Sequence, residues 1–247
     1  MKNKIISVAR IIVPLLFWIT VWQILSMIIN HTYFLPSVPE TFSALFMLLR
    51  TEKFFKIVFL TMLRVIIGLT LGIVFGILLS FLSHISDIVK DLTTPLMSII
   101  KSTPVATFII ILWVMMDGSS LAVFIAVLMV MPIIWQNMMD GYNSINRELS
   151  EVCDVFEFSF IKRMRILILP TLIKYLIPGI ITASGLAWKS EIAAEIIAYT
   201  KNSIGQHIND AKYNFDTATV FAWTLIIIVM SIVIEKITKY FLGRYRR

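Results

Sequence analysis

The stretch Glu151–Pro170 reads EVCDVFEFSFIKRMRILILP, and it is charged in a chain that is otherwise apolar. Acids recur at three-residue spacing, a basic cluster follows, and an apolar run closes with proline. On a helix, four apolar side chains would share one face: Val152, Val155, Phe156 and Phe160. The pattern predicts an amphipathic helix, with acids beside its apolar face, ahead of a segment that enters a membrane.

The composition of the whole chain points to the membrane as well. Of its 247 residues, 58% are hydrophobic and only 15% are charged, and the mean hydropathy is +0.88. Soluble domains carry about 25% charged residues, so too little polar surface is present to cover a water-soluble globule. The net charge of +7 gathers at the two ends of the sequence, beside apolar runs. That placement suits anionic lipid and not nucleic acid.

Six apolar segments are long enough, or nearly long enough, to cross a bilayer, which takes roughly 20 helical residues. We expect the spans at 11–29, 65–83, 102–116, 118–139, 166–194 and 217–234. The segment 11–29 resembles a secretion signal, but it is longer than a signal core and no small-residue cleavage site follows, so we expect a retained span. The sequence therefore predicts an all-α integral membrane protein with a single transmembrane domain over residues 1–247.

Orientation follows from the basic ends of the chain. An even number of spans places both termini on one side, and the positive-inside rule makes that side the cytoplasm. The loop 140–165 then also lies in the cytoplasm. The loop 30–64 carries four basic residues yet falls outside, against the same rule. Within it, Pro36, Pro39 and Glu40 precede an apolar run, which indicates a short helix along the outer interface.

Catalytic motifs are absent from the sequence. No phosphate-binding loop, no zinc-protease motif and no Cys/His metal spacing occurs, and Cys153 is the single cysteine. We expect no catalytic residue, no metal site and no cofactor in this chain. From the residues alone, the helix after Glu151 either rests on lipid headgroups or presents aromatic and acidic side chains to a cytoplasmic partner. The acids favour a partner only mildly.

The same stretch resembles the signature loop of permeases in binding-protein-dependent ABC importers, E-A-A-x3-G-x9-I-x-L-P. Glu151, Leu169 and Pro170 match at the full spacing, whereas Glu157 stands where glycine is usual. That glycine normally releases the helix into a turn. Further segments resemble the nitrate/sulfonate/taurine-type permeases in order along the chain: LPSVPET at 35–41, LRVIIGLTLGIVFGILLS at 63–80, STPVATFIIILWVMMDG at 102–118, PGIITASGLAWKSEIAAE at 178–195 and FAWTLIIIVMSIVIEK at 221–236.

The resemblance implies a permease like those of type I ABC importers, in the bacterial cytoplasmic membrane. Its partners would be a cytoplasmic ABC ATPase dimer that holds ATP and Mg, a second permease subunit in a homodimer, and an extracytoplasmic substrate-binding protein. The solute would be sulfonate-, taurine-, nitrate- or vitamin-precursor-like. The signature loop would be a coupling helix seated on the ATPase, formed by Glu151, Val152, Cys153, Asp154, Val155, Phe156 and Glu157.

The sequence identifies fewer candidate residues for the translocation pathway than for the coupling helix. The resemblance gives Glu195 a gate-region or structural role, and Ser102, Thr103 and Trp113 are further pathway candidates. Lys189 and Glu191 are expected to reach the outer interface and to be paired or hydrated there. The glycine stripe at 68, 72 and 76 is expected to pack within one subunit. An ATP-independent secondary transporter or channel, a vitamin-capture subunit and a membrane enzyme are the alternatives. The twenty-residue loop counts against the first two, and the missing catalytic motifs count against the third.

Overall fold

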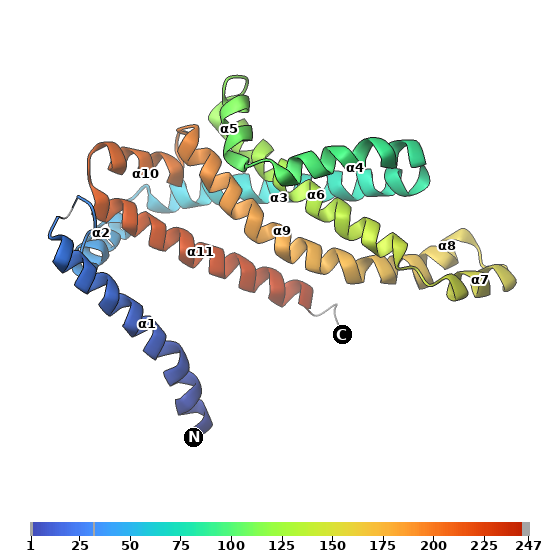
Figure 1. Ribbon diagram of the computed structural model, residues 1–247, viewed down its shortest axis with the longest axis horizontal. Coiled ribbons are helices and arrows are strands. Elements are labelled where there is room, and N and C mark those ends of the chain that lie inside the picture. The colour runs from blue at the N-terminus through green and yellow to red at the C-terminus, as the bar shows by residue number, and fades with distance from the viewer. Residues whose placement is uncertain (1, 32, 244–247) are drawn as a thin grey trace.

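The structure is a computed structural model that describes residues 2–31 and 33–243, and these residues form helices joined by short turns, with no strand among them (Figure 1). Arg244, Arg246 and Arg247, which contribute to the predicted basic C-terminus, lie outside the described residues. The helices are α1 (Lys2–Ile29), α2 (Val38–Arg50), α3 (Phe54–Ile85), α4 (Asp87–Ser102), α5 (Val105–Trp113), α6 (Gly118–Asn143), α7 (Arg147–Val155), α8 (Phe160–Arg163), α9 (Leu169–Ile197), α10 (Ile204–Tyr213) and α11 (Thr217–Gly243). A π-helical turn, Met164–Ile168, joins α8 to α9.

The molecule is elongated, and its two ends are built from different short helices. The α10 end holds α2, α10 and the start of α11, whereas the α7 end holds α7 and α8 together with the turn between α3 and α4 (Figure 1). The long helices α3, α6 and α9 run between these ends and pack on one another, with α6 against both α3 and α9. The hydrophobic core lies mainly among these three helices.

Small residues on α3 allow the close contact with α6. Gly68, Gly72 and Gly76 are buried, and a methyl group placed on each would lie only 2.5 to 2.7 Å from the Cβ atoms of Ala126, Val130 and Ile134, respectively. The glycine stripe therefore packs inside the subunit, as predicted.

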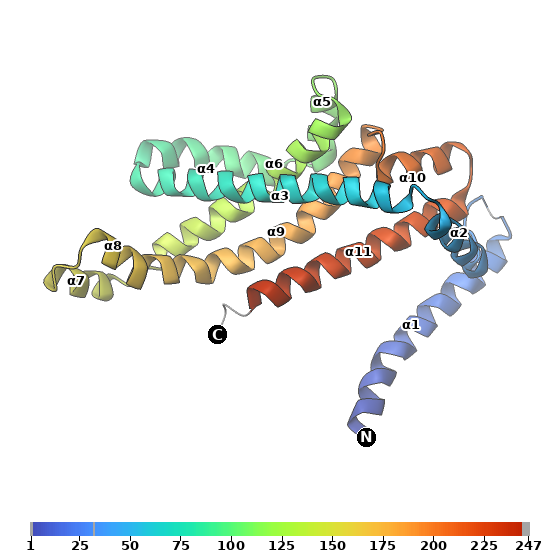
Figure 2. The same ribbon diagram turned by 180° about the vertical axis from the view of Figure 1, so that it is seen from behind.

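Helix α1 is the least attached part of the fold. It leans away from the other helices, as the view from behind shows (Figure 2), and among the helices it contacts chiefly α2. Its C-terminal part is nevertheless fixed: Trp22 Nε1 donates to the carbonyl of Pro36 at 3.0 Å, and Ser26 Oγ donates to that of Leu35 at 3.0 Å. Helix α2, expected as a short helix in the loop after the first span, begins with a capping box formed by Ser37 and Glu40.

The prediction of an all-α membrane protein with about six spans is confirmed. In the described part of the chain, five helical segments are long and apolar enough to cross a bilayer, and there are up to six if the bent pair α4–α5 counts as one. The boundaries differ from those expected at 65–83 and 166–194, because helix continues from 54 to 85 and from 160 to 197. Arg64 does not end α3, since its charge is neutralised within the fold.

The prediction of one continuous helical span at 102–116 was wrong. The segment 102–116 is not one helix: α4 ends at Ser102, α5 begins at Val105, and the two helices meet at an angle of 98°. Pro104 explains the break, because proline disfavours helical backbone at the residue before it, and Thr103 is accordingly extended with φ −83° and ψ 131°. Helix α4 instead runs back alongside α3.

Candidate functional site

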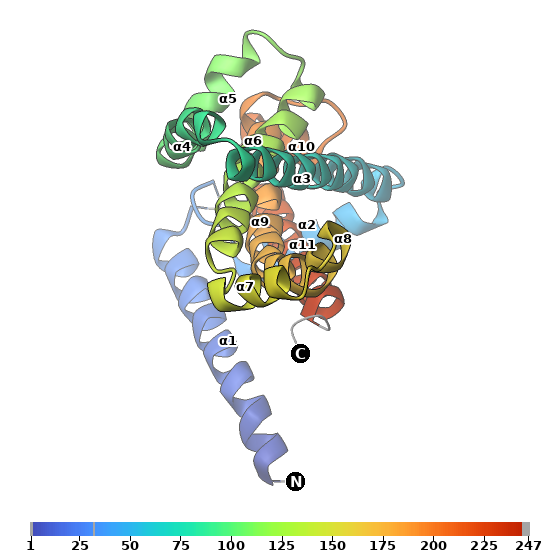
Figure 3. The same ribbon diagram turned by 90° about the vertical axis from the view of Figure 1, so that its right-hand side faces the viewer.

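The segment 144–163 forms the tip of the α7 end and lies beyond the long helices in Figure 1, and in the end-on view α7 and α8 face the viewer (Figure 3). Helix α7 begins after Asn146, whose side-chain oxygen accepts hydrogen bonds from the backbone N–H groups of Glu148 at 2.8 Å and Leu149 at 3.3 Å. Such a cap satisfies two of the four N–H groups that a helix start leaves unpaired. The helix therefore starts earlier than the predicted first residue, Glu151, and it is fixed locally.

The end of α7 resolves the question raised by Glu157. Glu157 adopts φ 50°, its N–H donates to the carbonyl of Asp154 at 3.0 Å, and the N–H of Phe158 donates to the carbonyl of Cys153 at 2.9 Å. This is the pair of hydrogen bonds that closes a Schellman motif, in which glycine is usual at the left-handed position. The chain thus keeps the turn expected of glycine while carrying glutamate there.

The four residues predicted to share one apolar face are divided between two helices. Val152 and Val155 belong to α7, Phe156 follows its last residue, and Phe160 begins α8. The side chains of Val155, Phe156 and Phe160 are 79%, 68% and 71% exposed. Together with Leu149 and Ile161, these residues form what we call the tip patch. An exposed apolar patch of this kind, rimmed by charged residues, is typical of an interaction surface.

Cys153 differs from the other predicted coupling residues. Its side chain is 6% exposed and packs toward the protein, whereas the acids at 151, 154 and 157 are exposed. Asp154 forms an ion pair with Arg163 at 2.7 Å, and Arg163 also donates to Ser150 Oγ. Cys153 is therefore buried within the tip, and the Asp154–Arg163 ion pair connects α7 to α8 at its surface.

A π-helical turn follows the tip immediately. The N–H of Leu169 donates to the carbonyl of Met164, five residues earlier. Pro170 supplies the physical reason, because it has no N–H for the carbonyl of Ile166 and its ring would crowd that carbonyl in a regular α-helix. π-turns inside helices are frequent at functional sites. Here the turn separates the tip from the long helix α9.

A buried ion pair stands at the opposite end of α9. Glu195 is fully buried, and its carboxylate lies 2.8 Å from Nη1 of Arg64 on α3. The same carboxylate accepts hydrogen bonds from Thr61 Oγ1 at 2.9 Å and from the N–H of Gly205 at 3.2 Å. Glu195 thus joins α3, α9 and α10. No added Cβ would fit at Gly205, because it would lie 2.4 Å from the carbonyl carbon of Glu195.

The expectation for Glu191 was wrong. Glu191 does not reach a hydrated interface: it is fully buried, and neither carboxylate oxygen has a hydrogen-bond partner. Lys189, by contrast, is exposed. Sequence reasoning missed the burial because it placed Glu191 with Lys189 at the interface, although the four-residue spacing of Glu191 and Glu195 puts these two on one helix face.

The remaining pathway candidates are not brought together with Glu195. The hydroxyls of Ser102 and Thr103 both donate to the carbonyl of Ile99, at 3.1 and 2.8 Å, where they flank the bend between α4 and α5. Trp113 ends α5 and is half exposed. None of the three hydrogen-bonds to Glu195 in the described structure. Their role in a pathway stays a prediction.

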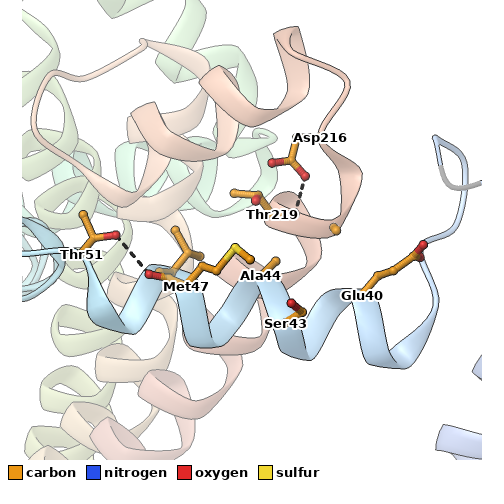
Figure 4. A pocket seen from close by; sticks show the side chains of 9 residues that line it. Glu40, Ser43, Ala44, Met47, Thr51, Asp216 and Thr219 are labelled. Carbon is orange, nitrogen blue, oxygen red and sulfur yellow. Dashed lines mark hydrogen bonds between the residues drawn. The ribbon is translucent and has the colours of Figure 1, made fainter.

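A hollow that the sequence did not predict lies at the α10 end, between α2 and the start of α11 (Figure 4). Its volume is about 480 Å³, and Glu40 and Asp216 are among its lining residues. Both carboxylates already serve as helix caps: Glu40 accepts from the N–H of Ser37 at 2.8 Å, and Asp216 accepts from the N–H of Thr219 at 3.0 Å. Both acids therefore have a structural role as helix caps.

Comparison with known proteins agrees with this arrangement. Residues 68–247 match the family described as "Binding-protein-dependent transport system inner membrane component". Because the match covers more than half of the sequence, the chain belongs to that family. It is multi-pass, as its apolar helices and the description of the family indicate.

Individual relatives add detail. The chain is 28% identical over 138 residues to the putative aliphatic sulfonates transport permease protein SsuC of Bacillus subtilis (strain 168), a match that covers 55% of this chain and 49% of that protein. The chain therefore spans about half the length of the relative it matches.

Two solved structures share the fold. A chain of the MetNI methionine ABC transporter in inward-facing conformations gives a TM-score of 0.67 at 12% identity, with 79% of this chain and 97% of that chain covered. A chain of an amino acid ABC transporter determined with histidines gives a TM-score of 0.61 at 16% identity, with 90% and 97% covered.

Proposed function

We propose that this chain is the permease subunit of an ATP-driven ABC importer and that it forms the path of a small solute through the bacterial cytoplasmic membrane. The tip patch is the observation that carries the proposal. Large apolar side chains stand exposed at the far end of the molecule. Those on α7 and at Phe156 lie outside the long apolar spans, whereas Phe160 and Ile161 stand at the very start of the segment 160–197. A motor subunit would cover such a surface.

The partner at the tip is a cytoplasmic ABC ATPase dimer, which holds the ATP and Mg. This chain has no catalytic role and needs no cofactor of its own. In the proposed orientation the α7 end and both termini are cytoplasmic, so the α10 end faces outward, where a binding protein delivers the solute. A second copy of the chain completes the path, and Ser102, Thr103 and Trp113 are retained as candidate residues for it.

The structure offers a route for motion from the motor to the spans. A shift of α7 reaches α8 through the Asp154–Arg163 bridge and reaches α9 through the π-helical turn. At its other end, helix α9 is hydrogen-bonded to α3 and α10 through Glu195, so its motion is passed to both helices. Because packed helices move as rigid bodies between discrete arrangements, a small displacement at the tip can reorient the spans. ATP binding would bias inward- and outward-open states by its different contacts with each.

The class of solute is supported by the relative's name. That protein is described as transporting aliphatic sulfonates, and a sulfonate-like solute is our first candidate, with taurine-, nitrate- and vitamin-precursor-like solutes as the others. Binding assays on the soluble partner protein would identify the solute.

The test is reconstitution of the permease, the ATPase and the binding protein in lipid nanodiscs, with ATP hydrolysis measured with and without solute. Phe156→Ala and Glu151→Lys should reduce ATPase docking and solute-stimulated hydrolysis while membrane insertion is unchanged. Phe46→Ala is the matched control, because Phe46 is 62% exposed but lies on α2 at the opposite end. Full stimulation in both tip variants, or solute uptake without any ATPase, would refute the proposal, and the latter result would identify a secondary transporter or channel.

A further inference from the structure

The charges buried at the α10 end do not balance. Glu191 and Glu195 are both fully buried on one face of α9, yet a single cation, Arg64, is present beside them in the described structure. Arg64 contacts Glu195 directly, and its second nitrogen, Nη2, donates to the carbonyl of Lys201 at 3.3 Å and to Ser119 Oγ at 3.4 Å. One carboxyl group is therefore left without a counter-charge in a low-dielectric interior, which is among the costliest arrangements in a protein.

The hydrogen bonds show which of the two carboxyl groups has no partner to stabilise a negative charge. Glu195 accepts from Arg64, Thr61 and Gly205, so its negative charge is well supported. Glu191 receives no hydrogen bond at either oxygen. The side chains of Glu191 and Glu195 are nevertheless neighbours, because both are buried on α9 and residues four positions apart lie on the same helix face. Two ionised carboxylates cannot bond to each other, because neither has a donor, but one added proton turns the same contact into a hydrogen bond.

We propose that Glu191 and Glu195 bind one proton between them, with Glu191 as the neutral acid that donates to Glu195 while Glu195 pairs with Arg64. The site then holds one negative and one positive charge, and each of the two buried carboxyl groups has a partner.

The surrounding elements offer no other source of charge balance in the described part of the chain. On α3 the nearby groups are Thr61 and Arg64, and the adjoining halves of α5, α6 and α11 carry no charged side chain. On α9 itself Lys189 is exposed. The outer surface holds Asp117, which caps α6, Lys53 before α3, Tyr199 and Lys201 between α9 and α10, and His207, Asp210 and Lys212 on α10. Burial lowers the pKa of His207, so this residue loses its proton on the acid side of its ordinary range. A change at alkaline pH therefore does not originate from it.

Loss of the proton has a structural consequence. A second negative charge would appear beside Glu195, at the junction where α3, α9 and α10 meet. Repulsion between the carboxylates would weaken that junction, and the fold would lose stability as the pH rises. An unfolded glutamate has already lost its proton above pH ~4.3. The folded protein keeps the proton at that pH, so rising pH favours unfolding until the folded protein also releases it. The proposal does not depend on what the protein transports.

Infrared spectroscopy of the full chain in lipid nanodiscs tests the proton directly. A protonated carboxyl group gives a C=O stretching band that shifts in D₂O, and we expect this band at neutral pH in the wild type. It should disappear in Glu191→Gln, and also in Glu195→Gln, where Glu191 becomes the ionised partner of Arg64. Glu148→Gln is the control, because Glu148 is exposed on α7 and its loss should leave the band unchanged. Absence of the band in the wild type would overturn the proposal.

Thermal unfolding across pH provides the second measurement. Relative to Glu191→Gln, the folding equilibrium constant of the wild type should fall by up to about tenfold per pH unit above pH ~4.3, the limit set by release of one proton, and should level off once the folded protein also loses that proton. The amide that Glu191→Gln introduces can donate to Glu195 as the protonated acid does, so this variant should remain folded. A difference between the two proteins that stays constant with pH would overturn the proposal. So would a dependence on Na⁺ in place of H⁺, which would show that a metal cation balances the charge.

Discussion

Arg64 on α3 and Glu195 on α9 form an ion pair of 2.8 Å although 131 positions separate them in the sequence. Glu195 is fully buried, and the Arg64 side chain is 13% exposed. Removing one member of such a pair leaves the other charge uncompensated, which is far more costly than losing an exposed salt bridge. The pair is therefore a point at which a single substitution should have a large effect.

Arg64→Met should lower the free energy of unfolding by about 3–5 kcal/mol, because it leaves the carboxylate of Glu195 buried without its cation. Glu195→Gln should cost less, since Glu191 can supply the negative charge that Arg64 needs. Thermal unfolding of both variants and of the double variant in detergent would measure the coupling between the two residues. Additive losses in the double variant would contradict a direct interaction.

The contact between α3 and α6 depends on the absence of side chains along one stripe. Gly72→Ala would place a methyl group 2.6 Å from the Cβ of Val130. The helices would have to separate, and we expect a loss of about 1–3 kcal/mol, observed as a lower unfolding temperature. Gly76→Ala, with its methyl group 2.7 Å from the Cβ of Ile134, should behave in the same way.

Gly185→Ala is the matched control for the stripe. Nothing lies within 4 Å of a Cβ atom added there, and alanine is favoured over glycine in a helix by up to about 1 kcal/mol. This variant should be as stable as the wild type or slightly more so. An equal loss of stability at 72 and at 185 would show that the stripe is not the determinant of packing.

The left-handed residue at the tip predicts a stabilising substitution. Glu157 holds φ 50°, a conformation that costs a side-chain-bearing residue roughly 1–2 kcal/mol and costs glycine little. Glu157→Gly should therefore slow amide hydrogen exchange at residues 157 and 158, which close the turn. Glu157→Ala keeps a Cβ atom in the same conformation, so it should not slow exchange. Equal protection in the two variants would contradict the explanation.

Cys153 is a natural reporter for the tip, since it is the single cysteine in the sequence and is 6% exposed. Its reaction with a maleimide should be slow in the folded protein and fast after denaturation. Arg163→Gln, which removes the bridge to Asp154, should speed the reaction by loosening α8 from α7. Arg147→Gln removes a fully exposed contact with Glu151 at 3.7 Å and should leave the rate unchanged. A fast reaction in the untreated wild type would show that the thiol is not buried.

The sequence was sufficient for the parts of the fold that depend on local chemistry. Long apolar runs require helices in a bilayer, because only intrahelical hydrogen bonds satisfy the backbone there. The capping box at Ser37 and the spacing of small residues on α3 are likewise local features. The apolar face near Val155 and Phe156 was also readable, since helical periodicity places these residues together.

Other features could not be read locally. Arg64 was taken as a span boundary, yet α3 passes through it, because a partner distant in the sequence neutralises its charge. Glu191 was expected at the outer interface, yet it is fully buried. The bend after Ser102 was missed because the apolar run there continues past Pro104 without a change of composition.

The sequence by itself determined that this chain spans a membrane as helices and presents an amphipathic charged segment, since both follow from hydrophobicity and periodicity. Only the tertiary structure decided that Glu157 takes the conformation of glycine, that two carboxyl groups share the α10 end with one arginine, and that α4 turns back along α3. The last two features depend on contacts between elements that pack against each other, and at Glu157 the hydrogen bonds that close the turn outweigh the preference of a residue with a side chain.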